Sequence, residues 1–143
     1  MAMLPFCGYN MADYFGHWLK VGSAAKPENL PKIFFVNWFR RDTDGRFLWP
    51  GYGENSRVLK WVFERIDGTA GAVETPIGNL PVVSDLDTSG LKVDAADMST
   101  LLSLDTAGWL EAVPQIREHY ATFGAKLPQQ LTAALDSLEK ALA

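Results

Sequence analysis

The spacing of apolar residues predicts that the chain begins with a helix over residues 11–21. Apolar side chains recur there three or four positions apart, which gathers them on one side of a helix. Asn10 precedes the stretch and can accept a hydrogen bond from its first turn. Residues 32–39 have a different pattern, because "KIFFVNWF" is a nearly unbroken run of β-branched and aromatic residues. That run predicts a strand buried on both faces.

The residues after this strand predict a turn, a short return strand and a second helix. In "RDTDGR", residues 41–46, Asp and Gly supply local hydrogen bonds and a left-handed backbone conformation. "FLW", residues 47–49, is then a short return strand that ends at "PGYG". An amphipathic helix begins at Ser56. The residues predicted for its apolar side are Val58, Leu59, Val62, Phe63 and Ile66.

The pattern then changes from irregular to helical. Residues 69–95 show no sustained period and are interrupted by proline and glycine, so they predict a loop with one extended piece. Three helical segments follow, at residues 97–104, 105–124 and 128–143. The order of elements predicts an α/β fold: a small β-sheet with flanking helices and a helical C-terminal tail.

Two prolines add detail to the tail. Pro128 is well placed in the first turn of the last helix. Pro114 is expected to begin or kink a helix, because it lacks the N–H that a helix interior needs. The last helix carries leucines at helical spacing, at positions 131, 135, 138 and 142.

Length and composition narrow the class of protein. A chain of 143 residues suits one domain with a core, and 48% hydrophobic residues indicate a globular protein. The net charge of -4 argues against a dedicated nucleic-acid-binding protein. No apolar run reaches the roughly 20 residues that span a bilayer, and the first ten residues lack the features of a secretory signal. The single cysteine, Cys7, fits a reducing, cytoplasmic setting and is expected to be a small buried hydrophobe.

The sequence gives little indication of a metal-binding site. His17 and His119 lie far apart and belong to no HExxH or Cys/His cluster. "DTDG", residues 42–45, resembles the opening of a calcium loop, but the remaining ligands and the closing Glu are missing. A turn is the better interpretation of these four residues.

Phosphate binding and base binding are both open at residues 51–56. "GYGENS" follows a predicted strand and opens a helix, where free N–H groups attract anions, although Asn55 or Ser56 can simply cap that helix. No GxxxxGK[ST] motif occurs in the chain. A purine base would suit the residue types better if the turns fold back on one another, because the rings of Phe39, Phe47 and Tyr52 could stack on the base and the Asn55 carboxamide offers both a donor and an acceptor. Packing in a core is the alternative role for the same rings.

Three segments of the sequence resemble a known family. "PKIFFVNWFRRDTDGRFLWPGYGENSRVLKWVFERIDG" resembles the guanine-binding segment of the GTP-dependent phosphoenolpyruvate carboxykinases. "MAMLPFCGYNMADYFGHWL" and "TPIGNLP" resemble other parts of that family in the same order, so the likeness runs from residue 1 to about 104. The resemblance implies one C-terminal piece of the GTP-binding domain over residues 1–143. Within it, we expect a helix, sheet and guanine-binding segment at 1–68, a loop region at 69–95 and a helical tail at 96–143.

The resemblance also implies an activity and a binding site. The family's enzymes convert oxaloacetate and GTP to phosphoenolpyruvate, GDP and CO2, with a manganese ion and a nucleotide-bound magnesium. Three aromatic rings and a following loop surround the guanine in that family. The matching residues here are Phe39, Phe47, Tyr52, Gly53, Glu54 and Asn55. Tyr52 stands where a Phe is expected; it keeps the stacking face and adds a hydroxyl. Cys7 stands where many relatives carry an aromatic residue, and it is not the family's reactive cysteine.

The rest of the family's machinery is expected upstream of this chain. The phosphate loop, manganese ligands, oxaloacetate-binding arginines and mobile lid have no counterpart in these 143 residues. The resemblance therefore assigns no catalytic residue and no metal ligand to the chain, and it implies that the isolated chain is inactive. Its expected partners are a guanine nucleotide, the upstream portion of the same enzyme and, for the isolated chain, other copies of itself, with neither nucleic acid nor membrane. The alternative is a stand-alone module that binds a purine nucleotide or a protein without catalysis.

Overall fold

The computed structural model describes residues 6–143, so the first five residues of the family-like opening lie outside the described part. The chain divides into two compact units. The first unit joins Met1–Pro31 with Asp105–Ala143, and the second unit is Lys32–Leu104. All six residues of the expected guanine site fall in the second unit.

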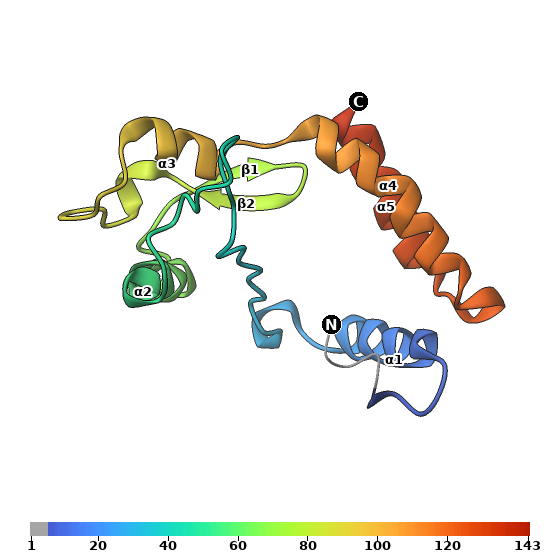
Figure 1. Ribbon diagram of the computed structural model, residues 1–143. Helices are drawn as coiled ribbons and strands as arrows, with labels where there is room; N and C mark the ends of the chain where they lie inside the picture. The colour runs from blue at the N-terminus through green and yellow to red at the C-terminus, as the bar shows by residue number, and fades with distance from the viewer. Residues whose placement is uncertain (1–5) are drawn as a thin grey trace. The chain divides into compact units, whose positions relative to one another are not determined.

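The first unit is built from three helices: α1 (Met11–Ala24), α4 (Thr106–Ala121) and α5 (Gln129–Leu142). Figure 1 shows α4 and α5 side by side at the carboxyl-terminal end of the chain. Met11 and Ala12 at the start of α1 are buried against Phe123, which follows α4. Cys7 is half-buried at the edge of this cluster, so it is less enclosed than the sequence suggests.

The helices of the first unit agree closely with the sequence patterns. Asn10 caps α1, because its side-chain oxygen accepts a hydrogen bond from the Ala12 N–H at 2.9 Å. Its side-chain nitrogen donates to the Phe123 carbonyl at 3.1 Å, which fixes α1 against the end of α4. In α5, Leu135 and Leu142 are buried, as the leucine spacing predicts. Pro128 immediately precedes α5, and Pro114 lies inside α4 and does not begin it.

The second unit combines two helices with a β-hairpin. Helix α2 is Asn55–Ile66 and α3 is Ala95–Leu102. Strands β1 (Ala72–Thr75) and β2 (Gly78–Pro81) pair antiparallel, with Ala72 opposite Pro81. The buried core joins one residue of α2, one of α3 and two from the connecting segments: Trp61, Met98, Ala70 and Leu86. Within residues 7–143, 3₁₀ turns occur at Pro27–Asn29, Tyr52–Glu54, Val83–Asp85 and Gly124–Lys126.

The position of the sheet differs from the sequence prediction. Residues 32–39 form no strand: residues 32–37 have no regular secondary structure, Trp38 and Phe39 lie in a turn, and residues 47–49 contribute only an isolated bridge between Phe47 and Arg41. The hairpin lies instead within residues 69–95, where the sequence predicts a loop. The reason is that a strand needs a neighbour for its N–H and C=O groups, and the described residues offer none to 32–39.

Burial along residues 32–39 also corrects the prediction of two covered faces. Phe34, Val36 and Trp38 are half-buried, whereas Ile33 and Phe35 are 89% and 95% exposed. Such alternation is the geometry of an extended chain with one face packed, since successive side chains point to opposite sides. The other face of this segment is apolar and uncovered within the described structure.

Helix α2 packs through part of the face predicted: Val58 and Val62 are half-buried, and Val62 packs against the core with Trp61. Trp61 is its buried residue and meets Phe34 edge-on, with ring centroids 6.0 Å apart. Three members of the predicted apolar side are exposed: Leu59, Phe63 and Ile66. They recur at helical spacing, so α2 is apolar on two sides, and only the side with Trp61 is covered by the described residues.

Arginine side chains attach residues 40–48 to α3. Arg40 donates to the carbonyl oxygens of Leu101, in the last turn of α3, and Ser103, just after it, at 3.0 and 2.8 Å. Arg46 makes two hydrogen bonds to the Asp97 carboxylate, at 3.1 and 2.7 Å, and also pairs with Asp42. The hydrogen bonds from Arg46, aided by its charge, lower the pKa of Asp97.

The lowered pKa of Asp97 predicts a pH dependence of this attachment. Its stabilising effect is present above the ordinary Asp pKa of about 3.9 and is lost as the pH falls through the lower value of the folded chain. In Arg46→Gln, the pKa of Asp97 should rise toward the ordinary value. Carboxyl-carbon NMR titration measures the pKa of Asp97 in the parent chain and in Arg46→Gln. Lys60→Gln is the control, because Lys60 pairs with Glu64 on α2. An unchanged Asp97 titration in Arg46→Gln would contradict the ion pair.

Candidate nucleotide-binding site

Residues 40–48 form a tight reversal of the chain that carries Phe47 back beside Phe39. The Asp42 N–H donates to the Arg46 carbonyl at 3.0 Å, and the Leu48 N–H donates to the Arg40 carbonyl at 3.0 Å. The side chain of Asp42 accepts from the backbone N–H of Asp44 and Arg46. The predicted turn is therefore confirmed, and its carboxylate is occupied by the turn itself.

The rings of Phe39 and Phe47 meet at the open end of this reversal. Their centroids lie 6.1 Å apart with an interplanar angle of 62°. Phe39 is 72% exposed and Phe47 is 45% exposed, so both rings present surface to solvent. The Arg41 guanidinium covers one face of Phe47, 3.9 Å from the ring centroid. This cation–π contact leaves other surface of the two rings exposed.

Tyr52 stands apart from this ring pair. It begins the 3₁₀ turn Tyr52–Glu54 and is 93% exposed, and it contacts no other ring within residues 6–143. Gly51 precedes it with φ at 113°, a conformation that only glycine adopts without strain. This glycine sets the direction in which the chain leaves the turn and enters α2.

Glu54 is fixed by the helix that follows it. The Arg57 guanidinium donates to the Glu54 carboxylate at 2.6 Å and to the Asp87 carbonyl at 2.8 Å. Arg57 thus joins the start of α2 to the segment before α3. Hydrogen bonds from Ser89, together with the charges of Arg57 and Lys60, lower the pKa of Asp87. Gly53 lies exposed between Tyr52 and Glu54, with open space around the position of a Cβ.

The side chain of Asn55 joins the start of α2 to Trp49, which follows the turn. Its Oδ1 accepts a hydrogen bond from the Trp49 Nε1–H at 2.9 Å, and Trp49 is 6% exposed. No side chain caps the first turn of α2, so the helix-cap alternative for Asn55 and Ser56 is wrong. The carboxamide of Asn55 is held by an indole and remains partly accessible.

The structure therefore brings together some of the six predicted residues and leaves others separate. Phe39 and Phe47 share a ring contact, while Gly53, Glu54 and Asn55 are neighbours at the start of α2. Sequence reasoning missed the residues that hold them: Arg41 over Phe47, Arg57 on Glu54 and Trp49 on Asn55. The spacing of three between Glu54 and Arg57 is a signal that could have been used. The contact of Trp49 with Asn55 depends on the turn between them and has no such signal.

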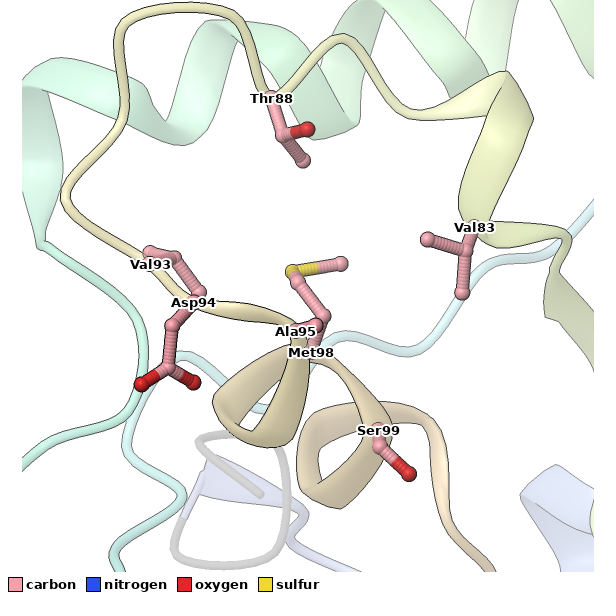
Figure 2. Close-up of a pocket in the computed structure, with 7 residues that line it drawn as sticks. All are labelled: Val83, Thr88, Val93, Asp94, Ala95, Met98 and Ser99. Carbon is pink, nitrogen blue, oxygen red and sulfur yellow. The ribbon is translucent and has the colours of Figure 1, made fainter.

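A separate hollow of about 370 Å³ lies in the second unit beside α3. Figure 2 shows Met98 between Val83 and Val93, with Thr88 across the hollow. The Asp94 carboxylate points away from it and accepts from the Asp97 N–H, as the cap of α3. None of the six predicted residues lines this hollow, so it is distinct from the candidate site.

Within residues 6–143, no three or more His, Cys, Asp or Glu side chains gather in an arrangement that could hold a metal ion. In the same range, no helix has the length and apolar character that crossing a membrane requires.

Comparison with known proteins gives a consistent set of relatives. Residues 1–141 match the family model described as the phosphoenolpyruvate carboxykinase C-terminal P-loop domain. A phosphoenolpyruvate carboxykinase [GTP] of Treponema pallidum subsp. pallidum is 62% identical over 139 residues, which cover 96% of this chain and 22% of that protein. The protein of the same name from Neocallimastix frontalis is 58% identical over 99% of this chain and 23% of its own length.

The match extends along almost the whole chain but along less than a quarter of each relative. A third relative, from Paenarthrobacter aurescens, is 49% identical over 99% of this chain and again only 23% of its own length. The family description names a P-loop, yet these 143 residues contain no GxxxxGK[ST] motif. On the extent of the family match and the identity of these relatives, the chain belongs to the GTP-dependent phosphoenolpyruvate carboxykinase family.

Proposed function

We propose that this chain is the guanine-recognition part of an enzyme that converts oxaloacetate and GTP to phosphoenolpyruvate, GDP and CO2. The observation that supports this most is the pairing of exposed aromatic rings with a held carboxamide in one segment. Phe39 and Phe47 offer ring surface, and Asn55 offers a hydrogen-bonding edge whose oxygen is already engaged. Tyr52, Gly53 and Glu54 complete the proposed site between them.

The two kinds of group have different roles in binding a base. Stacking on an aromatic ring contributes about 1–3 kcal/mol per base and is nearly the same for every base. Selectivity needs polar groups that the wrong base would leave unpaired, at a cost of about 1–3 kcal/mol each. In this proposal the rings of Phe39, Phe47 and Tyr52 supply affinity, and Asn55 supplies the preference for guanine.

Phosphoryl transfer is assigned to residues outside this chain. Such chemistry needs a phosphate-binding loop with its lysine and metal ions on the phosphates. The sequence of this chain has no phosphate-loop motif, and the relatives are more than four times its length. Manganese and magnesium would therefore be held by the upstream portion of the enzyme. The single cysteine agrees with a cytoplasmic site of action.

Replacing Asn55 tests the site directly. In the T. pallidum enzyme with this chain in place of its matching region, Asn55→Ala should weaken GTP binding by about 5- to 30-fold, the effect of one lost selective hydrogen bond. Phosphoenolpyruvate binding should change much less. Calorimetry with GTP and with phosphoenolpyruvate measures the two affinities. Ser56→Ala is the control, because Ser56 is exposed and caps nothing. Equal GTP affinity before and after the change in Asn55 would remove this residue from the site.

The isolated chain should have no carboxykinase activity. With oxaloacetate, GTP and manganese, we expect phosphoenolpyruvate formation at the rate of a blank without protein, and turnover above that blank would overturn the assignment. Calorimetry of the same sample decides between the two roles left open by the sequence. Guanine-selective binding at micromolar GDP would favour a stand-alone module, whereas no binding at millimolar nucleotide would favour a site completed by the upstream portion.

The exposed apolar faces support the upstream portion as a partner. Ile33 and Phe35 on the extended segment, Leu59, Phe63 and Ile66 on α2, and Trp18 and Val21 on α1 are all exposed. Burying such side chains stabilises a fold by about 25 cal/mol per Å² of apolar surface. In the full-length enzyme we propose that upstream residues cover them.

The same faces should make the isolated chain self-associate. An unpaired extended segment with apolar side chains can pair with a second copy. The double variant Ile33→Thr, Phe35→Thr keeps β-forming residues but removes the apolar face, and it should shift the chain toward monomer in sedimentation velocity. The control is Val73→Thr, Val83→Thr, which alters exposed valines elsewhere in the second unit. A parent chain that is monomeric throughout the micromolar to millimolar range would contradict this.

A further inference from the structure

The contact between Trp49 and Asn55 restricts how the carboxamide can be oriented. An indole N–H is a donor only, so its partner on Asn55 must be Oδ1 and not the amide nitrogen. The two atoms are 2.9 Å apart, and the indole belongs to a side chain that is almost fully buried. Turning the carboxamide over would place an NH₂ group against the indole N–H. That arrangement leaves a buried donor unpaired, which the fold disfavours.

The orientation leaves one group of Asn55 for a ligand. The NH₂ of Asn55 donates to no acceptor within residues 6–143, and the side chain is only partly buried. Oδ1 has two lone pairs, and the indole occupies one of them. The free edge of the carboxamide is therefore a donor, the NH₂, beside one remaining acceptor position on Oδ1.

This order of donor and acceptor distinguishes the two purines. A 6-oxopurine such as guanine presents an acceptor, O6, beside the donor N1–H, which complements the free edge of Asn55 as it is held. A 6-aminopurine such as adenine, stacked in the same orientation, places the donor N6–H₂ where guanine has O6 and the acceptor N1 where guanine has N1–H, and this edge complements the carboxamide only after the carboxamide is turned over. The indole opposes that second orientation.

We propose that Trp49 is a positioning residue that sets the preference of Asn55 for 6-oxopurines over 6-aminopurines. The proposal rests on the proposed function, because it concerns the same site. Trp49 touches Asn55 and acts on the base only through it. Without the indole, the carboxamide could bind either purine by turning over. The indole N–H therefore restricts Asn55 to the orientation that binds a 6-oxopurine.

The position of Trp49 is itself fixed by the neighbouring chain. Leu48 and Trp49 are both buried, and the Leu48 N–H donates to the Arg40 carbonyl. The Arg40 side chain is bound to carbonyl oxygens at the end of α3. The indole donor of Trp49 therefore belongs to a segment that is attached both to the turn and to α3. Its acceptor, Asn55, is the first residue of α2.

The test compares GDP, IDP and ADP binding to Trp49→Phe in the T. pallidum enzyme that carries this chain. Phenylalanine keeps a buried ring but removes the N–H. We expect the ratio of ADP to GDP dissociation constants to fall by about 5- to 30-fold, the range for one selective hydrogen bond. IDP should follow GDP, because it shares O6 and N1–H and lacks only the 2-amino group.

Trp61→Phe is a matched control. Trp61 is a second buried tryptophan of the same unit, and its Nε1 has no hydrogen-bond partner among the described residues. Its replacement removes a buried indole N–H of no proposed role, so the nucleotide ratio should stay at the parent value. A fall in Trp61→Phe as large as in Trp49→Phe would assign the effect to general loosening of the unit and overturn the proposal.

The other outcomes separate this proposal from the proposed function. Parent protein that binds GDP selectively, with an unchanged ratio in Trp49→Phe, would overturn the role of Trp49 and leave guanine recognition standing. Parent protein that does not distinguish GDP from ADP would overturn both. If Trp49→Phe fails to fold, NMR of the parent protein tests the orientation of the Asn55 carboxamide. GDP should slow the hydrogen exchange of the Asn55 side-chain NH₂, and ADP should not. Equal slowing by both nucleotides would contradict the fixed orientation.

Discussion

The anchoring of residues 40–48 to α3 is the constraint on which the candidate site depends. Residues 32–39 have no strand partner in the described structure, so backbone pairing does not hold this part of the chain. Arg40 and Arg46 instead attach the residues that follow it to α3, through the carbonyl oxygens of Leu101 and Ser103 at the end of that helix and the carboxylate of Asp97. Hydrogen bonds within residues 40–48 close the reversal that places Phe47 beside Phe39, and the two arginines fix that reversal, with the buried Trp49 that follows it, to α3.

A short series of contacts connects the anchored residues 40–48 to the Asn55 carboxamide, which is proposed to bind the base. Trp49 leaves the anchored turn and donates to Asn55 on α2, and Arg57 of the same helix joins Glu54 to the segment before α3. Each contact is a hydrogen bond with defined geometry, so the orientation of Asn55 is set by residues that no ligand needs to touch. The rings of Phe39 and Phe47, by contrast, are exposed, which leaves ring surface available for stacking.

The sequence predicts most of the helices and fails at the sheet, for a physical reason. Helices carry their own hydrogen bonds, so the spacing of Leu135 and Leu142 or the cap at Asn10 is sufficient to locate them. A strand depends on a partner, and the apolar run at 32–39 cannot indicate whether one is present. The family resemblance named the site residues. Their supports, Trp49 and Arg41, follow from folding of the turn and are not visible in any spacing.

The most direct measurement is a crystal structure with GDP of the full-length T. pallidum enzyme carrying this chain. The account predicts that the guanine contacts the rings of Phe39 and Phe47, with its O6 within hydrogen-bonding distance of the Asn55 side-chain nitrogen. The Trp49 indole should still donate to Asn55 Oδ1 in that complex. A guanine bound away from this segment, or one whose O6 faces Oδ1 of a turned carboxamide, would contradict it.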